Sequence, residues 1–212
     1  MTVEIVSRGL EELRDYFERL PSVAQQASVL AVNRGAQFGS TLARRETRDQ
    51  VNFSASYLNA EASDGRPRLG IVKRARGDDV EAVIRGRERP TSLARFVVGS
   101  RALGRRTSGR PVRVKVKSGG STVGMPSAWL VRLRAGKRLD DEVFNVGLAI
   151  RLKPGVRINK KQFGVQSFGR NVYLLYGPSV AQVFRSVARD LSDPVSDVVV
   201  EEFVRQFERL SK

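Results

Sequence analysis

The chain of 212 residues contains neither cysteine nor histidine. Without cysteine it can form no disulfide bond and no thiolate metal site. Without histidine it lacks the commonest general base and the commonest metal ligand, so no serine has such a partner. Carboxylates at Asp78, Asp79 and residues 140–142 could hold a hard cation, but a hairpin turn and a helix start or ion pair account for them more simply. The composition favours a protein that is not an enzyme and uses no metal or cofactor.

Long apolar runs are also absent. No run approaches the roughly 20 residues that cross a bilayer, and the opening sequence MTVEIVSRGLEEL lacks the basic and apolar regions of a signal peptide. Apolar residues nevertheless make up 41% of the chain, which is enough for a globular core. We therefore expect a soluble protein with no membrane partner.

Acidic residues are scarce in the middle of the chain. Residues 66–170 carry 26 basic and 7 acidic side chains, whereas residues 1–65 and 171–212 have net charges of −2 and −1, within a total of +16. So local an excess suggests a polyanionic partner, and arginine, which supplies most of it, suits phosphate contacts. The alternative explanation is that a high arginine content merely reflects a GC-rich genome, although such a bias would not spare both ends of the chain.

The basic excess is densest over residues 101–117, which contain no acidic side chain. Glycines interrupt any helix in the first part of this segment, so we expect a loop that leads into a strand. Aromatic residues are only 7% of the chain, which argues against base stacking and favours sequence-independent contacts with phosphates. A solvated loop is the competing interpretation. The DNA-facing candidates are Arg101, Arg105, Arg106, Arg110, Arg113, Lys115 and Lys117.

Helical spacing of apolar residues marks both ends of the chain. We expect helices over residues 7–20 and 22–49, the second lined with small residues, and a short helix capped by Ser54. Near the other end, Asp193 and Pro194 are expected to cap a closing helix. The helix expected before it has one apolar face, formed by Val180, Val183, Phe184, Val187 and Leu191.

Between the helices the pattern changes to that of β-strands. Residues 68–87 read as a hairpin around a Gly-Asp-Asp turn, and residues 112–117 alternate valines with basic residues. Further strands are expected over 128–136, 145–153 and 171–176, and long basic loops over 98–110 and 153–170.

This order predicts an α+β fold in which N- and C-terminal helices pack on a mostly antiparallel β-sheet with long basic loops. We expect one domain over residues 1–212. Its parts are N-terminal helices over 1–65, the sheet and its loops over 66–176, and C-terminal helices over 177–212.

The last strand meets the next helix abruptly at Tyr176, Gly177, Pro178 and Ser179. Glycine permits an unusual φ, proline fixes the next one, and Ser179 could cap the helix that carries Phe184. These five residues form either an architectural corner or a subunit contact, and the sequence leaves both open.

Three segments resemble the minor tail protein Z family of tailed bacteriophages, the tail completion proteins. LAVNRGAQFGSTLARRETRD, residues 30–49, is similar to the long N-terminal helix of that family. RERPTSLARF, residues 87–96, resembles its basic segment with a Leu-x-x-Phe anchor. YLLYGPSVAQVF, residues 173–184, resembles its strand-to-helix corner.

The resemblance implies a structural protein of the virion neck, assembled in the bacterial cytoplasm. Such a protein sits at the head-proximal end of the tail, next to the tail terminator and head–tail connector proteins, and makes the tail competent to join a head. It implies a homo-oligomeric ring around packaged DNA, six-membered if it matches the tail tube, and no cofactor. The rival hypothesis is a free basic protein that binds nucleic acid through sequence-independent phosphate contacts.

Overall fold

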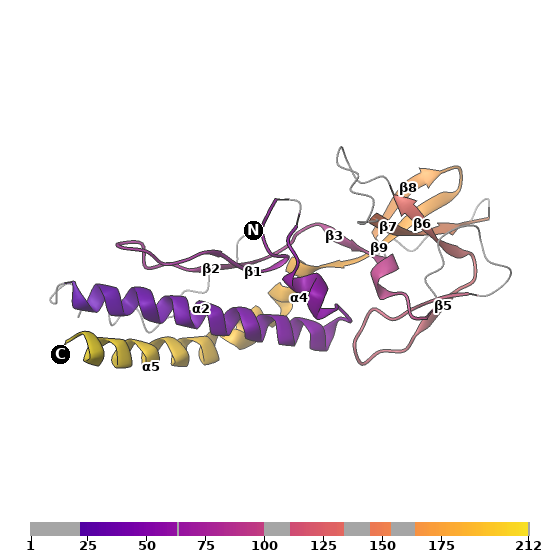
Figure 1. Cartoon of the computed structure of the whole chain (residues 1–212). Coiled ribbons are helices and arrows are strands. Elements are labelled where there is room, and N and C mark those ends of the chain that lie inside the picture. The colour runs from indigo at the N-terminus through magenta and orange to yellow at the C-terminus, as the bar shows by residue number, and fades with distance from the viewer. Residues whose placement is uncertain (1–21, 63, 100–110, 134–144, 154–163, 212) are drawn as a thin grey trace. The chain divides into compact units, whose positions relative to one another are not determined.

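The computed structural model describes residues 22–62, 64–99, 111–133, 145–153 and 164–211 (Figure 1). Contacts within the chain group into two units. The first contains the chain up to Arg48, Ser54–Glu88 and the chain from Val180 onward, and the second contains Asp49–Phe53 and Arg89–Ser179. Each unit is therefore discontinuous in sequence, and the single domain expected over residues 1–212 stays a prediction.

The first unit is built on two long helices, α2 (Val23–Gln50) and α5 (Ser192–Leu210), which lie side by side in Figure 1. The helix predicted over residues 22–49 is confirmed. Small residues recur at every fourth position of α2, so they line one face of the helix. The α5 residues Val195, Val199 and Phe203 pack with Ala27 and Ala31 in one buried cluster. The small-residue face consists of Ala27, Ala31, Gly35, Gly39, Ala43 and Thr47.

Two glycines let α2 and α5 approach closely. A Cβ atom at Gly35 would overlap the Cγ2 methyl of Val199, and one at Gly39 would lie 3.0 Å from Val195 Cγ2. The same Cβ at Gly39 would lie 3.2 Å from Ile84 Cδ1. Helix α5 and the side chain of Ile84 therefore cover this small-residue face within the chain.

A β-hairpin formed by β1 (Leu69–Lys73) and β2 (Val83–Gly86) also belongs to the first unit. Its turn contains Gly77 at φ +51°, in the left-handed region, which confirms the predicted hairpin and its Gly-Asp-Asp turn. The side chain of Asn33 on α2 donates to the Ala75 carbonyl (2.9 Å) and accepts from the Ala75 N–H (3.1 Å). This reciprocal pair fixes the hairpin on α2.

Three short helices in the described residues also belong to the first unit. Helix α3 (Ala55–Asn59) is capped as predicted, because the Ser54 hydroxyl accepts from the Tyr57 N–H. Helix α4 (Val180–Val187) and the 3₁₀ turn η2 (Ala188–Leu191) bury all five residues of the predicted apolar face. The predicted cap at Asp193 is wrong: α5 already begins at Ser192, which places Asp193 in its first turn.

The hairpin also packs on helix α4. A Cβ atom at Gly86 would lie 2.8 Å from the Ala181 Cα, and the Ala181 N–H donates to the Arg87 carbonyl (3.1 Å). Arg185 of α4 pairs with Glu88 at 2.5 Å. The start of α4 is therefore held by backbone contact with the end of β2.

The second unit contains a five-stranded antiparallel sheet and a two-stranded one. In the larger sheet, β9 (Val172–Ser179) pairs with β3 (Pro90–Ser92), β7 (Asn145–Arg151) and β8 (Gly164–Gly169), and β7 also pairs with β6 (Ala128–Leu133). The smaller sheet joins β4 (Val112–Val114) to β5 (Val123–Met125). The 3₁₀ turn η1 (Leu93–Phe96) follows β3 and buries both Leu93 and Phe96.

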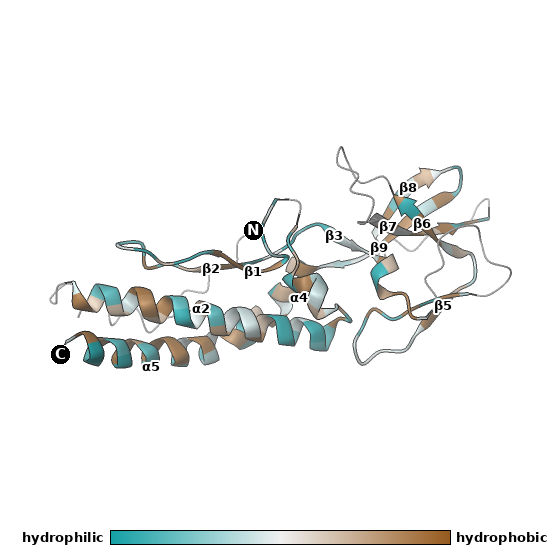
Figure 2. Cartoon of the chain, viewed as in Figure 1, coloured by the Kyte–Doolittle hydropathy of each residue, from teal (hydrophilic) through white to brown (hydrophobic). Residues whose placement is uncertain are grey.

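The α+β fold class is confirmed: a long N-terminal helix and a C-terminal helix accompany a curled antiparallel sheet. Figure 2 shows hydrophobic and hydrophilic residues alternating around α5, which fits its half-buried position. Three strands were missed by the sequence pattern. Strand β8 lies in a segment expected to be a loop, and β3 and β5 have only three residues each.

The close approach at Gly35 generates the first prediction. Gly35→Ala should lower the free energy of unfolding by about 1–3 kcal/mol, because the added methyl collides with Val199. That loss outweighs the gain of about 1 kcal/mol that alanine normally brings to a helix. In a Val199→Ala background the same change should be neutral or stabilising. A double-mutant cycle in urea measures the coupling, and a Gly35→Ala variant more stable than the parent would contradict the packing.

Candidate nucleic-acid interface and the strand-to-helix corner

The basic segment over residues 101–117 is described only in its second half. Arg101, Arg105, Arg106 and Arg110 lie outside the described residues. Arg113, Lys115 and Lys117 lie in the second unit, beginning on β4. The predicted DNA-facing role of all seven residues stays a prediction.

The regular strand is shorter than its alternating sequence predicts. Strand β4 ends at Val114, and the chain then runs beside η1 and residues 50–53. The Lys115 N–H donates to the Phe96 carbonyl (2.9 Å), and the Val116 carbonyl accepts from the Asn52 N–H (2.8 Å). The prediction of one strand over 112–117 is therefore wrong after Val114, because the pairing partner changes there.

The three described basic residues differ in exposure. Arg113 and Lys117 are exposed, and Lys115 is half-buried. Val114, between Arg113 and Lys115, is only 2% exposed. Among the described residues, no carboxylate forms an ion pair with any of the three. Their backbone is fixed while their charges stay available to a polyanion.

Other basic residues of the excess have structural partners. Arg68 donates to the Tyr57 carbonyl (3.0 Å) and lies over the Tyr57 ring, 4.4 Å from its centroid. Arg87 donates to the Tyr57 hydroxyl (3.1 Å). Lys73 donates to Glu81 and Asp79, and these hydrogen bonds, chiefly the one to Glu81, raise the pKa of Lys73. Part of the positive charge in residues 66–170 therefore stabilises the first unit.

No residue separates strand β9 from helix α4 at the predicted corner. Strand β9 continues to Ser179, so Gly177, Pro178 and Ser179 are strand residues. Opposite them, Pro90 pairs with Ser179 and Thr91 pairs with Gly177, which leaves Pro178 as the extra residue of a β-bulge. A bulge suits proline, which has no N–H to donate to a ladder.

Glycine is required at position 177 for space rather than for its φ. Gly177 does not have a positive φ, so the predicted unusual backbone angle is wrong. A Cβ atom there would lie 3.2 Å from Phe96 Cε2 and 3.3 Å from Leu93 Cδ2. The glycine therefore lets η1 lie directly against β9.

The other corner residues divide into buried and accessible ones. Phe184 and Ser179 are 1% and 4% exposed, so their side chains serve packing within the chain and offer no contact surface. Tyr176 is half-buried, and its hydroxyl donates to Gln166 of β8 (2.9 Å). A subunit contact at Tyr176, Gly177 and Pro178 stays a prediction.

The carboxylates weighed as a metal site fall into two groups. Asp78 and Asp79 lie in the hairpin turn, and residues 140–142 are outside the described residues. Elsewhere in the described ranges, no three acidic side chains gather where they could hold an ion. No helix among the described residues is both long and apolar enough to cross a membrane.

Comparison with known proteins adds no relative. No protein-family model, no curated protein and no solved structure matches the chain.

The crowding at Gly177 generates the second prediction. Gly177→Val should lower the unfolding free energy by about 1–3 kcal/mol, because its side chain meets Phe96 and Leu93. Gly169→Val is the matched control on neighbouring strand β8, where the nearest atom to a new Cβ is 4.0 Å away. Thermal unfolding of both variants compares them, and equal melting temperatures would show that the corner tolerates a side chain.

Proposed function

We propose that the chain is a structural protein of the neck of a tailed bacteriophage, a tail completion protein that makes the tail competent to join a DNA-filled head. It acts by assembly and performs no chemistry. Its partners are the tail terminator and head–tail connector proteins, and its basic segment faces the packaged DNA.

One observation carries the proposal: two of the three segments that resemble the tail completion family pair with each other. Residues 90–92 form the ladder with residues 176–179, and Leu93 and Phe96 close over Gly177. The Leu-x-x-Phe anchor is therefore buried against the strand-to-helix corner, although 80 residues separate the two in the chain. The third segment is the long helix α2. The two segments therefore form one paired structural element, as expected if both belong to the same part of the fold.

The charge pattern supports the DNA-facing part of the proposal. Arg113 and Lys117 are exposed, without an ion-pair partner among the described residues, on a backbone fixed by hydrogen bonds to residues 50–52 and Phe96. Repeated around a ring, such residues form a positive collar that holds a phosphate backbone without reading its bases.

A closed ring also requires heterologous contacts between subunits. The small-residue face of α2 supplies none of them, since α5 and the hairpin cover it. Exposed apolar side chains elsewhere can contribute: Val200 and Val204 of α5 are 42% and 50% exposed, and Phe168 of β8 is 50% exposed.

The test of the function is a deletion of the gene from the phage that carries it. Host cells should then accumulate tails of normal length and filled heads that do not join, and purified protein added to the lysate should restore infectious particles. Electron microscopy and plaque counts measure both effects. Normal infectivity without the protein, or tails of abnormal length, would contradict the proposal.

The charge of the loop gives a further prediction. Replacing Arg105, Arg106 and Arg110 by glutamine should leave tail length unchanged but lower the yield of particles that retain DNA. The defect should grow at raised salt, because the remaining phosphate contacts are screened.

A control variant removes three positive charges from other exposed positions, by glutamine at Arg48, Arg76 and Arg189. It should retain DNA as the parent does. Equal loss from both variants would mean that net charge alone matters. A protein that binds DNA in solution but is absent from purified virions would instead support the free nucleic-acid-binding alternative.

A further inference from the structure

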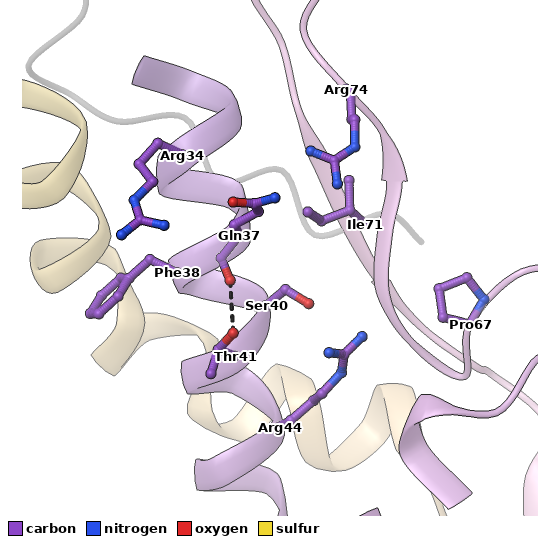
Figure 3. Close-up of a pocket in the computed structure, with 9 residues that line it drawn as sticks. All are labelled: Arg34, Gln37, Phe38, Ser40, Thr41, Arg44, Pro67, Ile71 and Arg74. Carbon is purple, nitrogen blue, oxygen red and sulfur yellow. Dashed lines mark hydrogen bonds between the residues drawn. The ribbon is translucent and has the colours of Figure 1, made fainter. Parts of the chain in front are cut away.

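A groove of about 570 Å³ lies in the first unit between helix α2 and strand β1 (Figure 3). None of the described residues that line it is acidic. Three arginines line it, Arg34, Arg44 and Arg74, together with Ser40 and apolar side chains that include Phe38 and Ile71.

Two of the arginines face the groove between the helix and the strand, from separate positions along it. In Figure 3 the guanidinium groups of Arg44 and Arg74 lie between the helix and the strand, on the side where Ser40 projects, whereas Arg34 lies on the other side of α2 beside Phe38. The pKa of Glu202 on α5 is lowered chiefly by the hydrogen bond from Arg205, and the charge of Arg34 makes a smaller contribution. Arg44 and Arg74 are therefore the arginines that a ligand in this space would meet.

The guanidinium of Arg44 is held in place by the hairpin. Its Nε–H donates to the Leu69 carbonyl (2.9 Å), which leaves the two terminal nitrogens for another partner. A Cβ atom at Gly70 would lie 2.8 Å from Arg44 Nη2, so the glycine makes room for the side chain. Arg44 is thus half-buried and positioned before any ligand arrives.

The positive charge of this pair is not balanced within the described part of the chain. No carboxylate there forms an ion pair with Arg44 or Arg74. Burial lowers the pKa of Arg44, which reflects the cost of taking its charge out of water. An external anion offsets that cost and gains from the reduced dielectric of the groove.

We propose that the groove between α2 and β1 is a phosphate-binding site in which Arg44 and Arg74 each contact a phosphate of a DNA backbone and Ser40 lines the site. Guanidinium groups bind phosphate oxygens in a bidentate manner, and a protein of net charge +16 concentrates polyanions around itself. The site goes beyond the proposed function, because it lies outside the loop at 101–117 and does not depend on that loop touching DNA.

The test uses the full-length protein and two variants of equal charge. Arg44→Gln/Arg74→Gln removes the pair, and Arg48→Gln/Arg76→Gln removes one exposed arginine from the same helix and one from the same hairpin. Arg74→Gln alone is a third variant, since Arg74 is exposed and its loss leaves the Arg44–Leu69 hydrogen bond intact. Circular dichroism confirms folding.

Two probes distinguish the sources of phosphate. Binding of a 20-base-pair DNA duplex is followed by fluorescence anisotropy between 50 and 200 mM salt, and binding of inorganic phosphate by calorimetry. The groove variant should weaken DNA binding about tenfold or more relative to the control variant and reduce the salt slope by about two. Arg74→Gln alone should give an intermediate loss.

Each remaining outcome is decisive. If inorganic phosphate binds the parent but not the groove variant while DNA affinity is unchanged, the phosphate site stands and its ligand is a small phosphate compound. If both charge-matched variants behave alike with both probes, the site is overturned. Binding of an acidic peptide, with neither DNA nor phosphate displacing it, also overturns it.

Discussion

The pairing of strand β9 is the constraint on which much of the structure depends. Its residues pair with β7 and β8 over the first half and with β3 over the second, and its last residue is followed directly by helix α4. Pro178 forms a bulge where the register between β9 and β3 shifts, so no loop interrupts the strand. Gly177 leaves room for the side chains of Phe96 and Leu93. Because backbone groups must be paired when buried, a side chain that displaces η1 here disturbs the pairing of β3 with β9.

Local periodicity predicted the parts of the fold that depend on neighbours in sequence. Helix α2, the β1–β2 hairpin, the cap at Ser54 and the buried face of α4 all follow from residues within a few positions of one another. Strand β8 could not be predicted, because its exposed residues show no alternation and only pairing with β9 makes it a strand. The role of Gly177 was misread for a similar reason. The sequence suggests that glycine is needed there for an unusual φ, whereas the structure shows that it leaves room for the ring of Phe96, 81 positions earlier.

The candidate sites show the same limit. The run of basic residues at 101–117 is visible in sequence, but most of its arginines lie outside the described residues. The groove at Arg44 and Arg74 was missed, because its arginines are 30 positions apart and Arg44 lies in a segment of net negative charge. The basic residues of this chain differ in whether they have a partner within the structure. Arg68 and Arg87 hold Tyr57, while Arg113 and Lys117 stay exposed.

The central claim is that the chain is a structural component of the tail–head junction. Cryo-electron microscopy of the intact virion tests it most directly, because the position and symmetry of the protein are then seen together. The account predicts a closed ring of this fold at the head-proximal end of the tail, with residues 101–117 facing the channel. A neck without this protein, a single off-axis copy, or a ring whose residues 101–117 face outward would contradict it.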